Sequence, residues 1–297
     1  MQKERRKLIV PFLAPAVIIY VVFFIYPAVQ ALWVSLHDWS GFTPQMDWVG
    51  LANFEEMLRD DIYRQVLLQT LGLLLFGGIL VFALSLFFTA LLSSGVRGRR
   101  FFRAVIFSPN VVAMIALTTL WSFVYNPRFG MLNGLLRGIG LEKLGKTAWM
   151  GPDLVYWAVL VAVVWIYVGF YAILFMAGAD KIPQSLYDAA IVEGANKVQM
   201  FVKVTLPLMW DVIAVGIVLW IIDALMQFEF YYAVSGAFPP IRIWTIPIYV
   251  FVLAFGKRNP IFRMGYGTAV AVSLLVFVIF FVVIAQRIVR RRETIEF

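Results

Sequence analysis

Five long stretches of the sequence carry no charged residue and are long enough to cross a lipid bilayer. They are Leu8–Leu36, Gln65–Val96, Ala104–Pro127, Leu154–Ala179 and Met264–Gln286. A spanning helix needs about 20 mostly apolar residues. A sixth stretch, Pro207–Phe228, is apolar apart from Asp211 and Asp223. In lipid, the backbone N–H and C=O groups of a span must form their hydrogen bonds within the protein, as they do in an α-helix. The sequence therefore predicts an all-α membrane protein with six transmembrane helices.

The composition agrees with this class and excludes several others. Of the 297 residues, 62% are hydrophobic and 14% are charged, whereas soluble domains carry roughly a quarter charged residues. The chain has no cysteine and a single histidine, His37, so we expect no disulfide and no metal site. The net charge is +8. In a membrane protein this charge marks cytoplasmic helix ends rather than a nucleic-acid partner.

The distribution of Lys and Arg predicts the orientation. With the N-terminus inside, the segments 1–7, 93–103, 180–206 and 286–297 are cytoplasmic, and their basic residues are more than twice as dense as those outside. We therefore expect a multi-pass protein of the cell membrane with both termini in the cytoplasm. The first apolar run is too long for a signal peptide and no small-residue cleavage site follows it, so we expect it to be retained.

The segments expected outside are short. Asn53 is a candidate N-cap for an amphipathic helix that starts at Phe54, and residues 126–145 suggest a second short interfacial element. Neither segment has room for a soluble domain. The sequence therefore predicts one membrane domain over residues 1–297.

The segment 180–207 is the least lipid-like part of the chain. Pro183 suits the first turn of a helix that continues through Ser185–Glu193, and Gly194 suits its end. A second short helix is expected over Asn196–Val204. In the first helix four residues fall on one small, acid-edged face, namely Leu186, Ala189, Ala190 and Glu193. A plain connector would need only two to eight residues, so this pattern favours a docking helix over a solvated loop.

Residues 182–207, IPQSLYDAAIVEGANKVQMFVKVTLP, resemble the EAA loop of binding-protein-dependent ABC importer permeases. That family has an acid-Ala-Ala triplet, then a glycine, then an aliphatic residue, any residue, and Leu-Pro. The triplet here begins at Asp188, the glycine is Gly194, and Val204 precedes the final Leu-Pro at the same spacing. Asp188 stands where Glu is commonest, and Asp211 stands where a second proline is frequent.

The resemblance extends along the chain and names a branch of the family. Residues 12–39 and 101–136 resemble the first and third spans of carbohydrate-type permeases, the maltose and glycerol-phosphate branch. The resemblance implies a type I ABC importer permease that translocates a sugar or sugar derivative. It implies that the 183–207 loop seats in a cleft on a cytoplasmic ATPase, through Leu186, Asp188, Ala189, Ala190, Glu193, Gly194, Ala195, Leu206 and Pro207.

The resemblance also implies the partners. These are a second homologous permease subunit, a cytoplasmic ABC ATPase dimer, and an extracytoplasmic substrate-binding protein, all working in membrane lipid. The chain has no Gly-x4-Gly-Lys-Ser/Thr loop, so we expect it to bind no cofactor itself and not to be an enzyme. ATP and Mg²⁺ are then used by the partner ATPase.

Polar and aromatic residues within the spans are candidates for the substrate pathway, because such residues in a membrane commonly face a cavity or partner. Asn110 and Met114 are expected on one face of the third span. The remaining candidates lie on the fourth span and at the end of the fifth, and they are Trp165, Tyr167, Gly169, Tyr171, Asp223, Gln227 and Glu229. Each has a structural alternative, which is an interfacial aromatic belt, a helix-packing hydrogen bond, or an ion pair with a partner subunit.

Three other functions remain open from the residues. One is an ABC permease for an amino acid, a peptide or an anion. Another is a secondary transporter, which would normally have more spans or inverted repeats. A third is a membrane scaffold or a lipid-modifying membrane enzyme. Such an enzyme would need clustered acids, histidine or a nucleophile within the spans.

Overall fold

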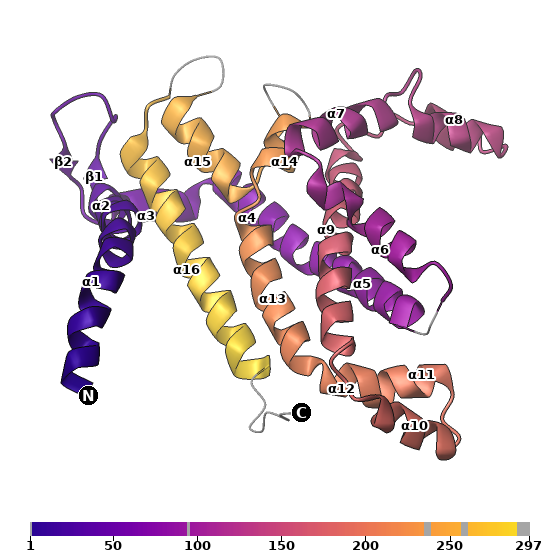
Figure 1. Cartoon of the computed structure of the whole chain (residues 1–297). Coiled ribbons are helices and arrows are strands. Elements are labelled where there is room, and N and C mark those ends of the chain that lie inside the picture. Colours follow the sequence, from indigo (N-terminus) through magenta and orange to yellow (C-terminus); the bar gives the residue numbers. More distant parts are fainter. Residues whose placement is uncertain (1, 94–95, 235–238, 257–260, 290–297) are drawn as a thin grey trace. The chain divides into compact units, whose positions relative to one another are not determined.

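A computed structural model describes residues 2–93, 96–234, 239–256 and 261–289, with side chains from Pro11 onward. In this part of the chain the structure is mostly helical (Figure 1). It divides into two compact units, Met1–Arg64 with Tyr249–Val276, and Gln65–Ile248 with Phe277–Phe297. The single permease domain stays a prediction.

The first unit begins with helical segments and a small hairpin. Its elements are α1 (Gln2–Tyr20), a π-helical segment (Val21–Ile25), α2 (Tyr26–Val34), β1 (His37–Asp38), β2 (Asp47–Trp48), α3 (Ala52–Arg59), the start of α4 (Asp61–Gly72), most of α15 (Ile246–Phe255) and the first half of α16 (Met264–Val289). The two strands pair antiparallel, with His37 opposite Trp48 and Asp38 opposite Asp47.

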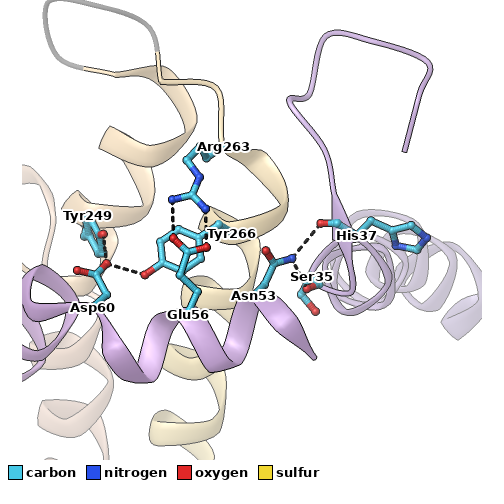
Figure 2. A network of polar contacts seen from close by, with 8 residues as sticks. All are labelled: Ser35, His37, Asn53, Glu56, Asp60, Tyr249, Arg263 and Tyr266. Atoms are coloured by element: carbon cyan, nitrogen blue, oxygen red, sulfur yellow. Dashed lines mark hydrogen bonds and ion pairs between the residues drawn. The ribbon is translucent and has the colours of Figure 1, made fainter. Parts of the chain in front are cut away.

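Asn53 does not cap α3, so that prediction is wrong. The capping position is Leu51, and Asn53 lies inside the first turn. Its buried amide donates 2.9 Å hydrogen bonds to the carbonyl oxygens of Ser35 and His37 (Figure 2). A buried carbonyl group without a hydrogen-bond partner is costly. The Asn53 amide therefore stabilises the contact between α3 and the residues that follow α2, instead of capping α3.

Two acidic residues, Glu56 in α3 and Asp60 directly after it, form hydrogen bonds with residues of α15, of α16 and of the segment just before α16. Glu56 accepts two hydrogen bonds from Arg263, at 2.8 and 2.6 Å. Asp60 accepts hydrogen bonds from the hydroxyl groups of Tyr249 and Tyr266 (Figure 2). The Arg263 guanidinium also lies 4.6 Å from the centre of the Tyr266 ring. This set of contacts, called here the Asp60 network, joins segments about 190 to 210 positions apart in the sequence.

The second unit holds the remaining helices. They are the rest of α4, a π-helical segment (Leu73–Gly77), α5 (Gly78–Ser93), α6 (Arg99–Phe107), a 3-10 segment (Ser108–Val111), α7 (Met114–Val124), α8 (Met131–Gly138), α9 (Val155–Ala179), α10 (Gln184–Val192), α11 (Lys197–Met200), a π-helical segment (Phe201–Thr205), α12 (Leu206–Leu208), α13 (Trp210–Leu225) and α14 (Glu229–Ala233). Short 3-10 turns lie at Leu144–Lys146 and Ile241–Ile243.

Helix α9 is the centre of this unit. Its side chains Tyr171 and Phe175 are fully buried, and α5, α6 and α13 pack on it. Ser85 of α5 donates to the carbonyl of Val168 at 3.0 Å. In Figure 1, α10 and α11 lie beyond one end of α9 and α13, while α7 and α8 lie at the opposite end. Helix α9 therefore leads into the 180–207 loop at one end and also carries four of the pathway candidates.

Among the described residues, five helical segments are long and apolar enough to cross a membrane. They are Pro11–Val34, Asp61–Ser93, Val155–Ala179, Trp210–Ala233 and Met264–Val289. They match five of the six predicted spans within five residues at each end, and the largest difference is an end at Ala233 rather than Phe228. The all-α membrane fold is thereby confirmed.

The third predicted span, Ala104–Pro127, is not one straight helix. The segments Arg99–Val111 and Met114–Val124 are bent by 102°, and together they make a sixth span if each bent pair counts as one. Val112 and Ala113 have extended backbones, with ψ of 137° and 139°. Helix α15 was not expected, because its ten residues are too short for a span.

Candidate functional site

Helix α10 has the ends that its sequence favours. Pro183 is the N-cap rather than a residue of the first turn. At the other end Gly194 has φ of +79°, and its amide donates to Ile191 while the amide of Ala195 donates to Ala190, both at 2.9 Å. These two hydrogen bonds form a Schellman cap, which favours glycine at the left-handed position. The predicted helix end at Gly194 is confirmed.

The second helix of the loop begins with a capping box. The Asn196 side chain accepts from the Gln199 amide at 2.9 Å, and the Gln199 side chain accepts from the Asn196 amide at 2.8 Å. Two backbone donors at the helix start are thereby satisfied. The Tyr187 and Thr205 hydroxyl groups are 2.9 Å apart, so α10 is also tied to the segment that enters α12.

The face proposed for docking is accessible in this chain. Asp188, Ala189, Glu193 and Gly194 are exposed, and Leu186 is 37% exposed. Ala190, Ala195, Leu206 and Pro207 are partly buried. The Gln184 amide donates to Asp188 at 3.1 Å across one turn of α10. A Cβ atom built on Gly194 would meet no atom within 4 Å, so the space above this residue is open.

The structure separates two pathway candidates that were expected on one face. Asn110 lies in the 3-10 segment, and Met114 begins α7 beyond the bend. The Asn110 amide donates to the Ile166 carbonyl of α9 at 3.0 Å. A Cβ atom on Gly169 would collide with the Ile106 carbonyl. Asn110 and Gly169 therefore allow the third span to pack closely against α9. This packing is the structural alternative to a role in the substrate pathway for both residues.

Four other candidates meet between α9 and α13. The Tyr171 hydroxyl donates to Asp223 Oδ2 at 3.0 Å, and the Tyr167 hydroxyl donates to Gln227 Oε1 at 3.2 Å. Tyr171 and Gln227 are buried, whereas Asp223 is partly buried. We call these four residues the Tyr–Asp cluster. The sequence analysis named all four residues as candidates but did not predict the hydrogen bonds between them.

The remaining candidates lie at more open positions. Trp165 is 43% exposed, and its ring centre is 5.6 Å from that of Trp121 in an edge-to-face arrangement. Glu229 is exposed at the start of α14. Trp121 was missed by the sequence analysis, although an aromatic residue within a span was an available signal. Among the described residues, no group of three His, Cys, Asp or Glu side chains could hold a metal ion.

Comparison with known families gives one match that covers most of the chain. Residues 83–294 match the family described as binding-protein-dependent transport system inner membrane component. This range includes the segment 180–207 and all the pathway candidates. The family assignment expected from the EAA-like pattern is thereby confirmed.

Curated relatives extend the similarity toward the N-terminus. The chain is 33% identical over 282 residues to the diacetylchitobiose uptake system permease protein NgcF of Streptomyces coelicolor, covering 91% of this chain and 79% of the relative. It is 30% identical over 280 residues to the trehalose/maltose transport system permease protein MalF of Thermococcus litoralis, covering 94% and 92%.

Solved structures agree with the fold. A bacterial ABC transporter involved in the import of the acidic polysaccharide alginate has a chain with a TM-score of 0.80 and 22% identity, covering 97% of this chain and 98% of that one. A bacterial alginate ABC transporter in complex with an alginate pentasaccharide-bound periplasmic protein has a chain with a TM-score of 0.80 and 21% identity, covering 98% of each chain. The likeness identifies the fold as that of an ABC importer permease.

Proposed function

The chain belongs to the family of binding-protein-dependent transport system inner membrane components, and we propose that it is the permease through which an ABC importer takes up a sugar or sugar derivative. The observation that carries the proposal is the 180–207 loop. Its pattern, its Schellman cap at Gly194 and its exposed face at Asp188 and Glu193 are those of a stiff helix available for docking. The relatives named for sugar uptake support the substrate class.

The loop is proposed to couple the permease to a cytoplasmic ABC ATPase. The coupling residues are Leu186, Asp188, Ala189, Ala190, Glu193, Gly194, Ala195, Leu206 and Pro207. Open space above Gly194 supports close approach by another chain. Since the sequence lacks a Gly-x4-Gly-Lys-Ser/Thr loop, the chain is proposed to bind no cofactor, and ATP and Mg²⁺ are used by the partner ATPase. Both termini then lie in the cytoplasm with the loop.

The other proposed partners are a second homologous permease and an extracytoplasmic binding protein that delivers the solute. A structural relative solved with its ligand-bound periplasmic protein supports the second of these. The family description itself names dependence on a binding protein. A single chain supplies one side of a pathway, so a sister permease completes it.

The Tyr–Asp cluster and Trp165 are the best-supported pathway residues. Sugars present hydroxyl groups to carboxylates and amides, and present C–H faces to aromatic rings. Asp223 and Gln227 supply polar groups between α9 and α13, and the Trp121–Trp165 pair supplies partly exposed aromatic surface. Met114, Glu229, Asn110 and Gly169 remain pathway candidates, and the contacts of Asn110 and Gly169 between the third span and α9 also support a packing role for these two.

The test is uptake by the complete complex in proteoliposomes. The chain is co-purified with its sister permease and ATPase, and a panel of radiolabelled sugars, amino acids, peptides and anions is offered with the binding protein. We expect sugar uptake that requires both ATP and the binding protein. Uptake of a non-sugar would replace the substrate class, and uptake driven by an ion gradient without ATP would support a secondary transporter instead.

A further inference from the structure

Asp180, the first residue after α9, binds two arginines of α6 at once. Arg99 Nη2 is 2.6 Å from its Oδ1, and Arg103 Nη2 is 2.9 Å from its Oδ2. The two arginines are four positions apart and therefore share one face of α6. Arg103 Nε also lies 3.2 Å from the sulfur of Met176, one turn earlier in α9. Each carboxylate oxygen thus has its own guanidinium partner.

These side chains are only partly buried, with 26% to 40% of each exposed. Ion pairs this open contribute little to stability. Partial burial acts to raise the pKa of Asp180, but the hydrogen bonds and charges of Arg103 and Arg99 outweigh it and hold the pKa below its ordinary value. The carboxylate is therefore ionised at neutral pH. The two ion pairs then serve mainly to fix the position of the end of α9 relative to α6.

The ion pairs form one end of a longer contact between α6 and α9. At the other end, Gly169 lies against the Ile106 carbonyl, and the Asn110 amide reaches the Ile166 carbonyl at 3.0 Å. Asp180 and Gly169 are about 16 Å apart along α9 at 1.5 Å per residue. The segment from α6 to the bend therefore follows α9 in the antiparallel direction, from the start of the 180–207 loop toward α7.

We propose that Asp180 is a positioning residue for coupling, which holds the start of the 180–207 loop to α6. The inference rests on the proposed function. A displacement of α10 then moves α6 together with α9, and the bend at Val112–Ala113 passes the movement to α7. Helix α7 carries Trp121, which meets Trp165 of α9. Energetic coupling of this kind travels through chains of packed and hydrogen-bonded groups.

The experiment measures solute taken up per ATP hydrolysed by the assembled complex in proteoliposomes. The probe is a mixture of radiolabelled diacetylchitobiose, trehalose, maltose and sn-glycerol 3-phosphate, offered with the binding protein. Asp180→Asn keeps the shape of the side chain and removes its charge. We expect the ratio to fall about 10-fold, the size of a typical coupling energy between sites. Asp180→Glu restores the charge, and we expect it to retain most of the ratio.

Arg100→Gln is the matched control. Arg100 lies beside Arg99 on α6, is exposed, and forms no ion pair within the described part of the chain. We expect it to leave the ratio unchanged. A purely structural role for Asp180 would lower the amount of complex recovered but not the ratio per assembled complex. If Asp180→Asn fails to assemble, Arg99→Gln and Arg103→Gln each keep one ion pair, and a reduced ratio is expected in both.

The outcomes separate this inference from the proposed function. If the wild-type complex takes up none of the four solutes, its substrate is not among them, and stimulation of ATP hydrolysis by the binding protein becomes the coupling measurement. Absence of any ATP-dependent activity in the wild type overturns both. A wild-type complex that couples normally, with unchanged coupling in the Asp180 and arginine variants, overturns only the role of Asp180.

Discussion

The Tyr171 hydroxyl donates a 3.0 Å hydrogen bond to Asp223 Oδ2 and so joins α9 to α13 through two residues 52 positions apart. The neighbouring hydrogen bond from Tyr167 to Gln227 lies one turn earlier in α9 and two residues past the end of α13. An acid in a transmembrane helix is costly unless it has a partner. The tyrosine therefore gives Asp223 an intramolecular partner.

Tyr171→Phe removes this donor and leaves the ring in place. We expect the complex to lose about 1 kcal/mol of stability, the usual size of an interhelical hydrogen bond in a membrane. Thermal denaturation of the purified complex measures the loss. Asp223→Asn keeps an oxygen that can accept from Tyr171, so it should be less destabilising. A larger loss with Asp223→Asn would contradict this account. Wild-type uptake by Asp223→Ala would remove the residue from the pathway.

Gly194 tests whether glycine is needed for the backbone or for docking. Nothing lies within 4 Å of an added Cβ, but the φ of +79° costs most L-residues roughly 1–2 kcal/mol and asparagine less. We expect Gly194→Val to increase hydrogen exchange in the last turn of α10 and to reduce uptake, and Gly194→Asn to resemble wild type. If Gly194→Asn has normal exchange yet no coupling, the approach of the ATPase, not the cap, requires glycine.

Asn196→Ala removes the side-chain acceptor of the capping box. Loss of such a cap costs about 1 kcal/mol, so hydrogen exchange at the Gln199 amide should accelerate roughly fivefold. Asn196→Ser is the control, because a serine hydroxyl can accept the same hydrogen bond. Equal exchange rates in the alanine and serine variants would mean that the capping box does not stabilise α11.

Asp60 predicts an acid-dependent loss of stability. Burial acts to raise the pKa of Asp60, but hydrogen bonds from Tyr249, Tyr266 and the backbone outweigh it, so the pKa lies below its ordinary value. A lowered pKa in the folded state means that the stabilisation is complete above about pH 4, the ordinary range for an aspartate. The stabilisation is lost as the pH falls through the lowered pKa.

We therefore expect the difference in melting temperature between wild type and Asp60→Asn to be constant from pH 7 to about pH 5 and to shrink below about pH 4. Glu56→Gln is a useful comparison, because it breaks the neighbouring ion pair with Arg263 and leaves Asp60 in place. A difference that grows as the solution becomes more acidic would have the wrong sign and would contradict the pKa assignment.

Gly169→Ala should separate the third span from α9. The added Cβ would meet the Ile106 carbonyl, which is backbone and cannot rotate away. We expect a destabilisation of roughly 1–3 kcal/mol, as in other overpacked interiors. Gly134→Ala is the matched control, since it lies in α8 with nothing within 4 Å and should gain about 0.5–1 kcal/mol. Thermal denaturation of both variants would falsify the packing role if their shifts were equal.

Local patterns in the sequence predicted much of the fold and little of its tertiary pairing. Long runs without charged residues indicate transmembrane helices, because few other backbone structures can cross a bilayer. Gly194 indicates the end of α10, because few other residues readily adopt the left-handed backbone conformation found there. Asn53 failed as a predicted cap because its amide satisfies carbonyl groups 16 and 18 positions away. The ion pairs of Asp180 with Arg99 and Arg103 join residues 81 and 77 positions apart. Such long-range partners leave no local periodicity to detect.

The 102° bend between Val111 and Met114 has a consequence for hydration. Helix α7 begins at Met114 without a side-chain cap, and the first amide groups of a helix have no partner within it. Each unsatisfied backbone group costs several kcal/mol in hydrocarbon. At membrane depth these amides must be wetted or covered by protein. The start of α7 is also partially positive, so this bend favours electron-rich oxygen atoms over lipid tails.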